Sequence, residues 1–316
     1  MSDEDRNLLA KIAWLYYMDG LTQKEIGQRL NLSRLKVVRL LQRARAEGIV
    51  EIRIAPDTRL NVSLSRALED RFALSEAIVT DTPGSDEETL QQVGKAAASV
   101  LDRYIDDNQV IGVGMGRTLS NMLSFMQPRK TENVVVRGIA GSYEVPGRDE
   151  SAFKISWRLA DLLEADIEQL YCPMIVADAA TRRALLKDRE LSALAERIPQ
   201  ADLALIGIGA LDKESPLLRM GYLDEKSLKS IQKRGAVGEI MGRFFGVEGQ
   251  PVASPLDDRI IGITISELCA IPNVIALASG PAKIVPLVGA LQSGCLSALV
   301  TDHDTAEAVI EHSGSQ

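Results

Sequence analysis

The residues best suited to chemistry lie in glycine-rich segments that each follow a short apolar run. The first segment reads GVGMGRTL and places Gly114 and Gly116 immediately before Arg117 and Thr118. Glycine lets the backbone come close to a ligand, and the amides of a following helix start, together with Arg117 and Thr118, can hold an anion. The alternative for this segment is a tight strand-to-helix turn that binds nothing.

Two further segments repeat this arrangement. Gly141 and Ser142 follow one apolar run, and the stretch Ala278-Ser279-Gly280-Pro281-Ala282-Lys283 follows another. A lysine in the first turn of a helix opposes the helix dipole, and an anion bound beside Lys283 would remove that conflict. The alternative is that Lys283 extends into solvent, as most lysines do.

An acidic residue stands among small residues in a fourth stretch, GAVGEI, which contains Glu239. A carboxylate accepts hydrogen bonds, so Glu239 can bind the hydroxyl groups of a sugar. The alternatives are that it caps a helix or forms a surface ion pair with Arg234 or Arg243.

Short β-branched runs alternate with helical segments from Ala77 onward, which is typical of an α/β fold. The runs are apolar without alternation, so we expect a mostly parallel sheet covered by helices, with ligands at the carboxyl ends of its strands. The expected strands are Ala77–Thr80, Val110–Val113, Asn133–Arg137, Ile167–Tyr171, Leu203–Ile208, Val274–Leu277 and Ala298–Thr301. The clearest expected helices are Thr89–Tyr104, Ala152–Leu163, Glu225–Lys233 and Pro281–Gln292.

The stretch from Thr22 to Gly48 predicts two helices joined by a tight turn. Thr22 and Glu25 have the spacing of a capping box, which begins a helix near Gln23, and Ser33 can cap the second helix. The second helix carries five basic residues against one acid, beside an expected apolar stripe formed by Leu35, Val38, Leu41 and Ala44. We expect the apolar face of this helix to pack against the rest of the domain and the basic face to contact a negatively charged partner.

This order of elements is typical of a helix-turn-helix, whose second helix enters the major groove of DNA. A further helix is expected over residues 8–17, and the alternating run Ile49–Ile54 predicts one arm of a wing. A solvated basic helix face is the alternative interpretation. The residues expected to contact DNA are Thr22, Gln23, Ser33, Arg34, Lys36, Arg39 and Arg43.

Charge divides the 316-residue chain into a basic beginning and an acidic remainder. Residues 1–55 hold ten basic and seven acidic residues, net +3, whereas the whole chain is −8, which leaves −11 for the rest. Only the beginning is suited to phosphate backbones. We expect a DNA-binding domain at 1–55, a linker or oligomerisation helix at 56–72 and an effector domain at 73–316. The linker helix either packs on the effector domain or pairs with its copy in a dimer.

The three cysteines and the apolar segments indicate a cytoplasmic protein. Cys172, Cys269 and Cys295 are odd in number and far apart, so we expect buried thiols rather than disulfides or a zinc site. The first residues are polar and acidic, which does not fit a signal peptide. Prolines, glycines and Lys283 interrupt the most apolar window, 273–300, so no membrane span is expected. No cofactor or metal is expected.

The motifs, taken together, resemble the SorC family of bacterial sugar-binding transcriptional regulators. The run IAWLYYMDGLTQKEIGQRLNLSRLKVVRLLQRARAEGIV is similar to that family's helix-turn-helix. The similarity continues through GVGMGRTL, AGSY, ALIGIGA, RGAVGEIMGRFF, ASGPAKI and LVTDHDTA, and so covers almost the whole chain.

The resemblance implies an effector domain similar in fold to the glucosamine-6-phosphate deaminase and ribose-5-phosphate isomerase group. It implies a repressor, a dimer or more specifically a homotetramer, whose hold on double-stranded operator DNA changes when a phosphorylated sugar or polyol binds. It further implies that the phosphate meets the amides of Arg117, Thr118 and Leu119, with Gly141, Ser142 and Lys283, and that Glu239 takes hydroxyls. Two departures from the family pattern concern the effector: Glu239 stands where Asp is common, and Leu119 where some members have a second hydroxyl.

An enzyme acting on sugar phosphates, fused to a DNA-binding module, is the alternative function, because the same fold houses isomerases and deaminases. The two histidines, His303 and His312, lie near the end of the chain, and His303 is expected at a polar helix start. A DNA-binding module has no role in such an enzyme. We therefore expect a regulator with no catalytic residues.

Overall fold

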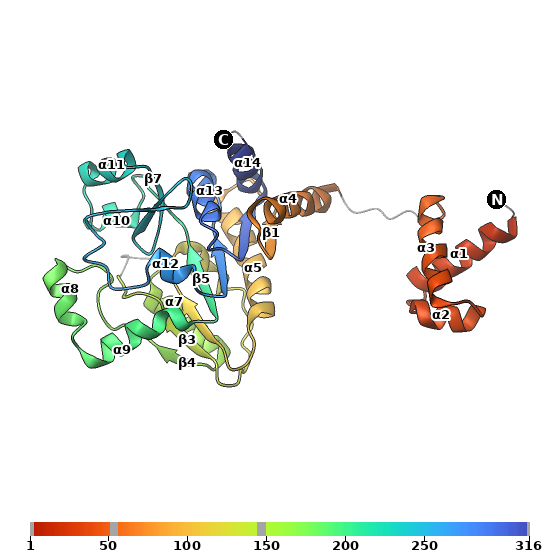
Figure 1. The fold of residues 1–316 in the computed structure, drawn as a ribbon, viewed down its shortest axis with the longest axis horizontal. Helices are drawn as coiled ribbons and strands as arrows, with labels where there is room; N and C mark the ends of the chain where they lie inside the picture. Colours follow the sequence, from red (N-terminus) through yellow and green to blue (C-terminus); the bar gives the residue numbers. More distant parts are fainter. Residues whose placement is uncertain (1–2, 51–55, 144–149, 315–316) are drawn as a thin grey trace. The chain divides into compact units, whose positions relative to one another are not determined.

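The computed structural model describes residues 3–50, 56–143 and 150–314, with side chains described except at 3–4 and 56–59. The chain forms two compact units, Met1–Pro56 and Asp57–Gln316 (Figure 1).

The first unit contains three helices, α1 (Asp3–Tyr17), α2 (Gln23–Leu30) and α3 (Arg34–Ala46). The predicted capping box is confirmed: Thr22 Oγ1 accepts from the Glu25 amide at 3.3 Å, and the Glu25 carboxylate accepts from the Thr22 amide at 2.8 Å. Ser33 caps α3 as predicted, because its Oγ accepts from the Lys36 amide at 3.2 Å. These caps satisfy amides that a helix start leaves without partners.

The apolar face of α3 differs from the predicted stripe. Leu35 is 64% exposed and Val38 is half-buried, whereas Val37 is fully buried beside Leu41. Ala44 is buried as predicted. At 3.6 residues per turn, positions 37, 41 and 44 share one face, which packs on buried residues of α1 and α2, and position 35 points away from it.

The predicted wing strand Ile49–Ile54 lies mostly outside the described residues, which stop at 50 and resume at 56. Within the described part, the amides of Ile49 and Val50 donate to the Ala44 carbonyl at 2.9 and 3.1 Å. Both side chains pack against Leu9 and Ala44 and close the end of α3.

The second unit is built on a seven-stranded sheet with the order β1-β11-β10-β5-β2-β3-β4, in which every pair of neighbours is parallel. All seven predicted strands are present, with ends shifted by a few residues. Their bounds are β1 Glu76–Thr80, β2 Val110–Val113, β3 Val135–Gly138, β4 Asp166–Glu168, β5 Leu203–Gly207, β10 Asn273–Leu277 and β11 Ala298–Asp302.

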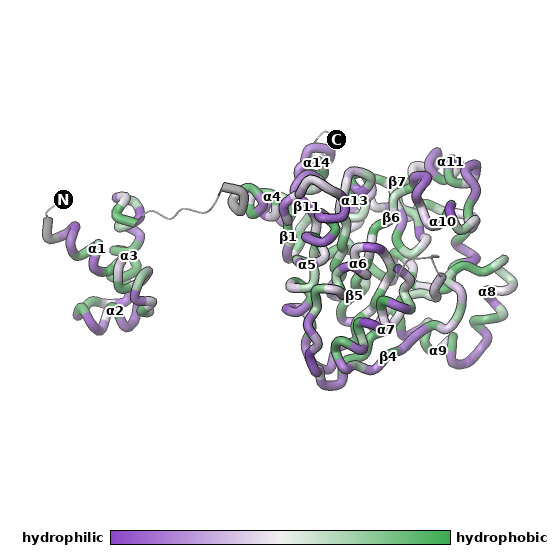
Figure 2. Tube along the Cα trace, turned by 180° about the vertical axis from the view of Figure 1, so that it is seen from behind, coloured by the Kyte–Doolittle hydropathy of each residue, from purple (hydrophilic) through white to green (hydrophobic). Residues whose placement is uncertain are grey.

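Both faces of this sheet are buried, which explains the apolar runs without polar alternation. On β5, Leu203 and Leu205 join the core beneath α5 (Asp86–Tyr104), α6 (Arg117–Met122) and α7 (Ala152–Leu163). Ala204 and Ile206 join the core on the other face, with α4 (Pro56–Phe72), α13 (Ile284–Gln292) and α14 (His303–Gly314). Figure 2 shows apolar residues along the central strands and polar residues along outer helices such as α14.

The predicted helices are confirmed, with small changes at their ends. Ala152–Leu163 and Glu225–Lys233 (α11) have the predicted bounds, and the helix expected at 89 begins at Asp86. The helix expected from Pro281 begins as a 3₁₀ turn, η2 (Pro281–Lys283), before α13. The remaining helices are α8 (Ala179–Leu185), α9 (Arg189–Arg197), the 3₁₀ turn η1 (Ile198–Gln200), α10 (Pro216–Arg219) and α12 (Ile265–Leu268).

A second, antiparallel sheet of four short strands was not predicted. Its order is β6-β7-β8-β9, with bounds Gly209–Ala210, Ala236–Ile240, Arg243–Gly246 and Pro251–Val252. Two of the strands have only two residues, which is too short for a hydrophobic period to show in the sequence. This sheet places Glu239 of β7 opposite Gly209 of β6.

The order of the strands reverses between β2 and β5. From β2 the chain proceeds outward through β3 and β4, then returns to β5 and proceeds the other way through β10 and β11. The Gly114 amide donates to the Leu205 carbonyl at 2.9 Å and joins the two halves at this point. In open α/β sheets, ligands bind outside the carboxyl ends of the strands at such a reversal.

The structure corrects the prediction made for the cysteines. Cys269 and Cys295 are joined as a disulfide, with Cα atoms 4.2 Å apart, so the prediction of three separate thiols is wrong for this pair. The two cysteines are 26 residues apart in the sequence, one before β10 and the other after α13, and the fold brings them together.

Within the described ranges, no helix is both long and apolar enough to cross a bilayer.

Candidate functional site

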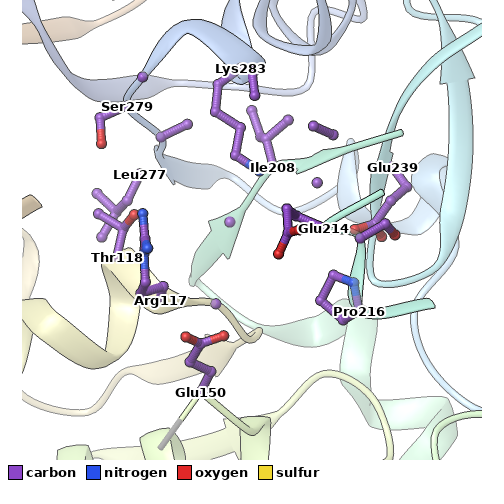
Figure 3. A pocket seen from close by; sticks show the side chains of 18 of the residues that line it. Arg117, Thr118, Glu150, Ile208, Glu214, Pro216, Glu239, Leu277, Ser279 and Lys283 are labelled. Atoms are coloured by element: carbon purple, nitrogen blue, oxygen red, sulfur yellow. The ribbon is translucent and has the colours of Figure 1, made fainter. Parts of the chain in front are cut away.

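A cavity of about 430 Å³ opens at the carboxyl ends of β2, β5 and β10, where the strand order reverses. It brings together five residues that the sequence analysis selected from separate segments, namely Gly116, Arg117, Thr118, Glu239 and Lys283. Figure 3 shows Lys283 extending into the cavity, with Arg117 and Thr118 on one side and Glu239 on the other. The arrangement combines two cations, hydroxyls and a carboxylate acceptor.

Arg117 and Thr118 form the first turn of α6, directly after the Gly116 cap. The Gly116 amide donates to the Glu150 carbonyl at 3.2 Å, which holds this cap in place. Leu119 is fully buried and anchors α6 in the core, so it can offer a ligand only its backbone amide. Gly114 packs against β5, where a Cβ atom would lie 3.1 Å from the Leu205 carbonyl oxygen.

Gly141 and Ser142 are not among the residues that line the cavity. A Cβ atom on Gly141 would lie 2.6 Å from the Cys172 carbonyl oxygen, so this glycine permits two backbone segments to pack closely. Ser142 Oγ accepts from the Phe153 amide at 3.4 Å, at the start of α7. The next residue, Tyr143, does line the cavity, so this segment contributes through a side chain that the sequence analysis did not select.

Backbone groups on two sides fix the position of the Glu239 carboxylate. Its Oε2 accepts from the Gly242 amide at 2.7 Å, and its Oε1 lies directly over Gly209, where any Cβ atom would overlap it. Burial raises the pKa of Glu239, while the Gly242 amide and the positive charge of Lys283 act to lower it. A bound hydroxyl that donates to Oε1 would stabilise the ionised carboxylate in this buried position.

Lys283 reaches the cavity from η2. Gly280, whose backbone φ is 95°, precedes this turn and follows β10. Burial lowers the pKa of the Lys283 amine, Glu239 and Asp212 act to raise it, and Arg117 acts to lower it. Two cations therefore lie close enough to repel each other. A phosphate between Arg117 and Lys283 would remove this repulsion and make charge-assisted hydrogen bonds to both.

Several lining residues were missed by sequence reasoning. They come from the segment after β5, from the start of α5 and from the segment before α7, and they are Asp86, Tyr143, Glu150, Asp212, Glu214 and Ser215. One signal was available: the segment after Leu203–Gly207 also follows a buried strand, and it contains Gly209 and polar residues. Burial and the nearby Glu239 raise the pKa of Tyr143, so its hydroxyl remains protonated.

The residues predicted to contact DNA differ in their exposure and in their bonding partners. Ser33, Arg34, Lys36 and Arg39 are exposed on the first half of α3. Arg43 is engaged by Glu47, with Nε and Oε1 2.6 Å apart. The remaining two lie at the start of α2, where the hydroxyl of Thr22 donates to the Glu25 carboxylate and Gln23 is half-buried.

Comparison with known proteins gives matches along almost the whole chain. The Sugar-bind family, a sugar-binding domain, matches residues 57–311. The uncharacterized transcriptional regulator YjhU of Escherichia coli K12 is 31% identical over 93% of this chain and 91% of its own length. The transcriptional regulator LsrR of Klebsiella pneumoniae is 32% identical over 97% of this chain and 93% of its own length.

The full-length sorbitol operon regulator SorC of K. pneumoniae has a similar crystal structure, with a TM-score of 0.75 and 27% identity over 98% of this chain and all of that one. The similar proteins are named as transcriptional regulators, so the chain is a regulator and the enzyme alternative is not supported. The chain belongs to the SorC-type family of transcriptional regulators with a sugar-binding domain.

Proposed function

We propose that this protein is a cytoplasmic repressor that releases double-stranded operator DNA when a phosphorylated sugar or polyol binds in its cavity. One observation carries the proposal: Arg117, Thr118 and Lys283 meet Glu239 in a single cavity at the reversal of the strand order. The cations would bind the phosphate and the carboxylate would bind hydroxyls.

The names of related proteins support this effector class. One relative, 30% identical, is the erythritol catabolism regulatory protein EryD of Brucella abortus, and another, 28% identical, is the sorbitol operon regulator of K. pneumoniae. Both names refer to sugar alcohols. A compound of this class carries several hydroxyl donors, which suit a cavity rich in carboxylate acceptors.

DNA binding is assigned to α2, α3 and the turn between them as a helix-turn-helix. In this motif, the first residues of the second helix contact base edges or flanking phosphates in the major groove. Ser33, Arg34, Lys36 and Arg39 lie exposed on that part of α3, whereas Arg43 already pairs with Glu47. We therefore assign DNA contact to the first half of α3 rather than to Arg43.

The substitution Arg39→Ala is expected to weaken operator binding by about 10-fold, because it removes one exposed charge contact. Fluorescence anisotropy of labelled operator DNA at fixed, moderate salt measures the effect. Lys11→Ala is the matched control, since Lys11 is also exposed and basic but lies on α1. Equal operator affinity for the Arg39→Ala variant and the wild-type protein would remove Arg39 from the interface.

Two hydrogen bonds connect the turn beside Lys283 to α4, the first helix of the second unit. One is made by the last residue of β11 and the other by the residue that follows it. The Gly280 amide donates to Asp302 Oδ2 at 3.1 Å. The next residue, His303, places Nδ1 2.7 Å from Asn61 Oδ1 on α4. We propose that effector binding at this turn shifts α4 through Asp302 and His303, which requires the effector to bind two states of the protein with different affinity.

His303→Ala is expected to separate effector binding from DNA release. Effector affinity should stay within about 2-fold of wild type, while the effector-induced change in operator affinity should fall by about 5-fold or more, the scale of ordinary coupling energies. Operator titrations with and without saturating effector measure this change. His312→Ala, an exposed position on the same helix, is the control. Full coupling in the His303→Ala variant would exclude this route.

We further propose that the protein acts as a homotetramer, with α4 as one contact between copies. Leu60 is 58% exposed and Val62 is 47% exposed on α4, although both are apolar. Such side chains, on the helix that follows the DNA-binding unit in the chain, suit pairing with the same helix of a second copy. Analytical ultracentrifugation gives the number of copies directly.

A further inference from the structure

An apolar side chain lies on the exposed face of α3. Leu35, the second residue of this helix, is 64% exposed, although it is only two positions from the fully buried Val37. At 3.6 residues per turn, Leu35 lies roughly opposite Val37 and Ala44, two of the buried residues of α3. The helix therefore presents an apolar group on the side where a surface helix normally presents a polar one.

The turn between α2 and α3 fixes the direction in which Leu35 points. The Leu32 amide donates to the Gly27 carbonyl at 2.8 Å, and a Cβ atom on Gly27 would lie 2.7 Å from the Leu32 carbonyl oxygen. Gly27 thus lets the turn pack closely on α2. Val37 is buried in one core with Ile26 of α2, so a rotation of α3 about its axis would expose it to water at a cost in free energy. Leu35 is therefore held on the outward face.

The surroundings of Leu35 on α3 are positively charged. Arg34, Lys36 and Arg39 are exposed, and the sequence of α3 contains no acidic residue. Arg39 lies one turn further along the same face as Leu35. An apolar protein surface on this face would bury three cations together with Leu35, which is costly, whereas the phosphate backbones of DNA pair with such cations. The partner that fits this face is therefore the major groove of DNA.

The chemistry of the major groove specifies what Leu35 can contact there. A leucine side chain has no hydrogen-bond donor or acceptor, and the one apolar group that base pairs present in this groove is the C5 methyl of thymine. Against a polar base edge, Leu35 would displace water without replacing its hydrogen bonds, which costs free energy. Against a thymine methyl, the same contact removes two apolar surfaces from water and is favourable.

We infer that Leu35 is a specificity-determining residue, which selects one thymine per bound copy of α3 by contact with its C5 methyl group. The neighbouring cations position the helix on the DNA, and Leu35 reads the base. This inference rests on the proposed DNA binding, because it specifies what the helix-turn-helix recognises. It does not depend on the identity of the effector.

The test compares thymine with uracil, which lacks only the C5 methyl group. The full-length protein first selects a DNA fragment from a random-sequence library. Each thymine of the labelled fragment is then replaced in turn by deoxyuridine, and binding is measured by fluorescence anisotropy at fixed, moderate salt. We expect the wild-type protein to lose affinity by about 4-fold at the thymine that Leu35 contacts, the effect of one buried methyl group.

Leu35→Ala identifies the side chain that is responsible. This variant is expected to bind the thymine fragment at least about 4-fold more weakly than the wild-type protein, and to lose no further affinity when that thymine becomes uracil. Alanine is a strong helix former, so α3 is retained. Met18→Ala is the matched control, because Met18 is also apolar and 67% exposed but lies outside α3. The control should keep the full difference between thymine and uracil.

A second variant measures the base preference itself. Leu35→Gln keeps a long side chain on α3 but replaces its apolar end with an amide, which pairs with adenine in the major groove. Selection from the same library is expected to return fragments in which one thymine per bound copy of α3 is replaced, most often by adenine, while the other selected positions are unchanged. Selection of thymine at every one of the original positions would overturn the inference.

The outcomes separate this inference from the proposed function. If the wild-type protein and Leu35→Ala respond equally to uracil at every thymine, or if the wild-type protein responds at none, Leu35 reads no methyl group and the inference is overturned, while DNA binding by α3 stands. If the wild-type protein selects no fragment from the library, the proposed DNA binding fails, and the inference fails with it.

Discussion

Replacing Lys283 with alanine is expected to weaken effector binding by about 100-fold, since a charge-assisted hydrogen bond in a buried site contributes on the order of 1.5–3 kcal/mol. Lys283 extends into the cavity, where Glu239 and Asp212 lie near its amine, so a ligand phosphate loses one of the two cations described in the lining. Removal of this lysine also leaves the ligand facing Glu239 and Asp212 with only Arg117 to offset them. Calorimetric titration with the sugar or polyol phosphate that binds the wild-type protein most tightly measures the loss.

The control for this prediction is Lys229→Ala on α11, where the lysine is 70% exposed and forms an (i, i+4) pair with Glu225. That variant should bind the effector as the wild-type protein does. Operator affinity in the absence of effector should be unchanged in both variants, because neither residue lies in the DNA-binding unit. Wild-type effector affinity in Lys283→Ala would remove Lys283 from the site.

Gly209→Ala is expected to abolish the response to effector while operator binding is retained. A Cβ atom at position 209 would overlap Glu239 Oε1, and the side chain of Glu239 cannot retreat without losing its bond from the Gly242 amide. The acceptor for ligand hydroxyls is therefore displaced. We expect effector affinity to fall by about 100-fold, because a misplaced buried carboxylate neither binds the hydroxyl nor admits the ligand.

Gly84→Ala is the matched control for Gly209→Ala. No atom lies within 4 Å of a Cβ built on Gly84, so the substitution adds the same methyl group without a clash. Thermal unfolding of each variant checks that the second unit remains folded. An effector-responsive Gly209→Ala variant would show that Glu239 is free to move and does not determine binding.

The main sheet could be predicted from the sequence because each of its strands is buried on both faces. Leu203 to Ile206 alternate between two apolar cores, and such runs stand out against amphipathic helices. The caps at Thr22 and Ser33 were equally predictable, since they depend on residues three apart. Local rules suffice for these elements.

The small antiparallel sheet and the inner face of α3 could not be predicted in the same way. Strands of two residues, such as Gly209–Ala210, have no period, and only their pairing with β7 makes them strands. On α3, Leu35 and Val37 are both apolar, and the sequence alone does not show which one meets α1. Tertiary packing decides this.

Part of the candidate site could be predicted because parallel strands end at one edge. Arg117 and Lys283 follow β2 and β10, and the topology brings them to one cavity. Gly141 and Ser142 follow β3 in the same way but pack beside Cys172 and Phe153 instead, because β3 lies one strand farther from the reversal than β2 does.

In the proposed switch, a ligand bound among Arg117, Lys283 and Glu239 weakens the binding of operator DNA. The direct measurement is fluorescence anisotropy of a labelled DNA fragment, selected by the protein from a random-sequence library, during titration with the sugar or polyol phosphate that binds most tightly. Wild-type protein is expected to release the fragment as the ligand saturates, while Lys283→Ala remains bound at the same ligand concentration. Unchanged DNA affinity in the ligand-saturated wild-type protein, or equal release from Lys283→Ala, would contradict it.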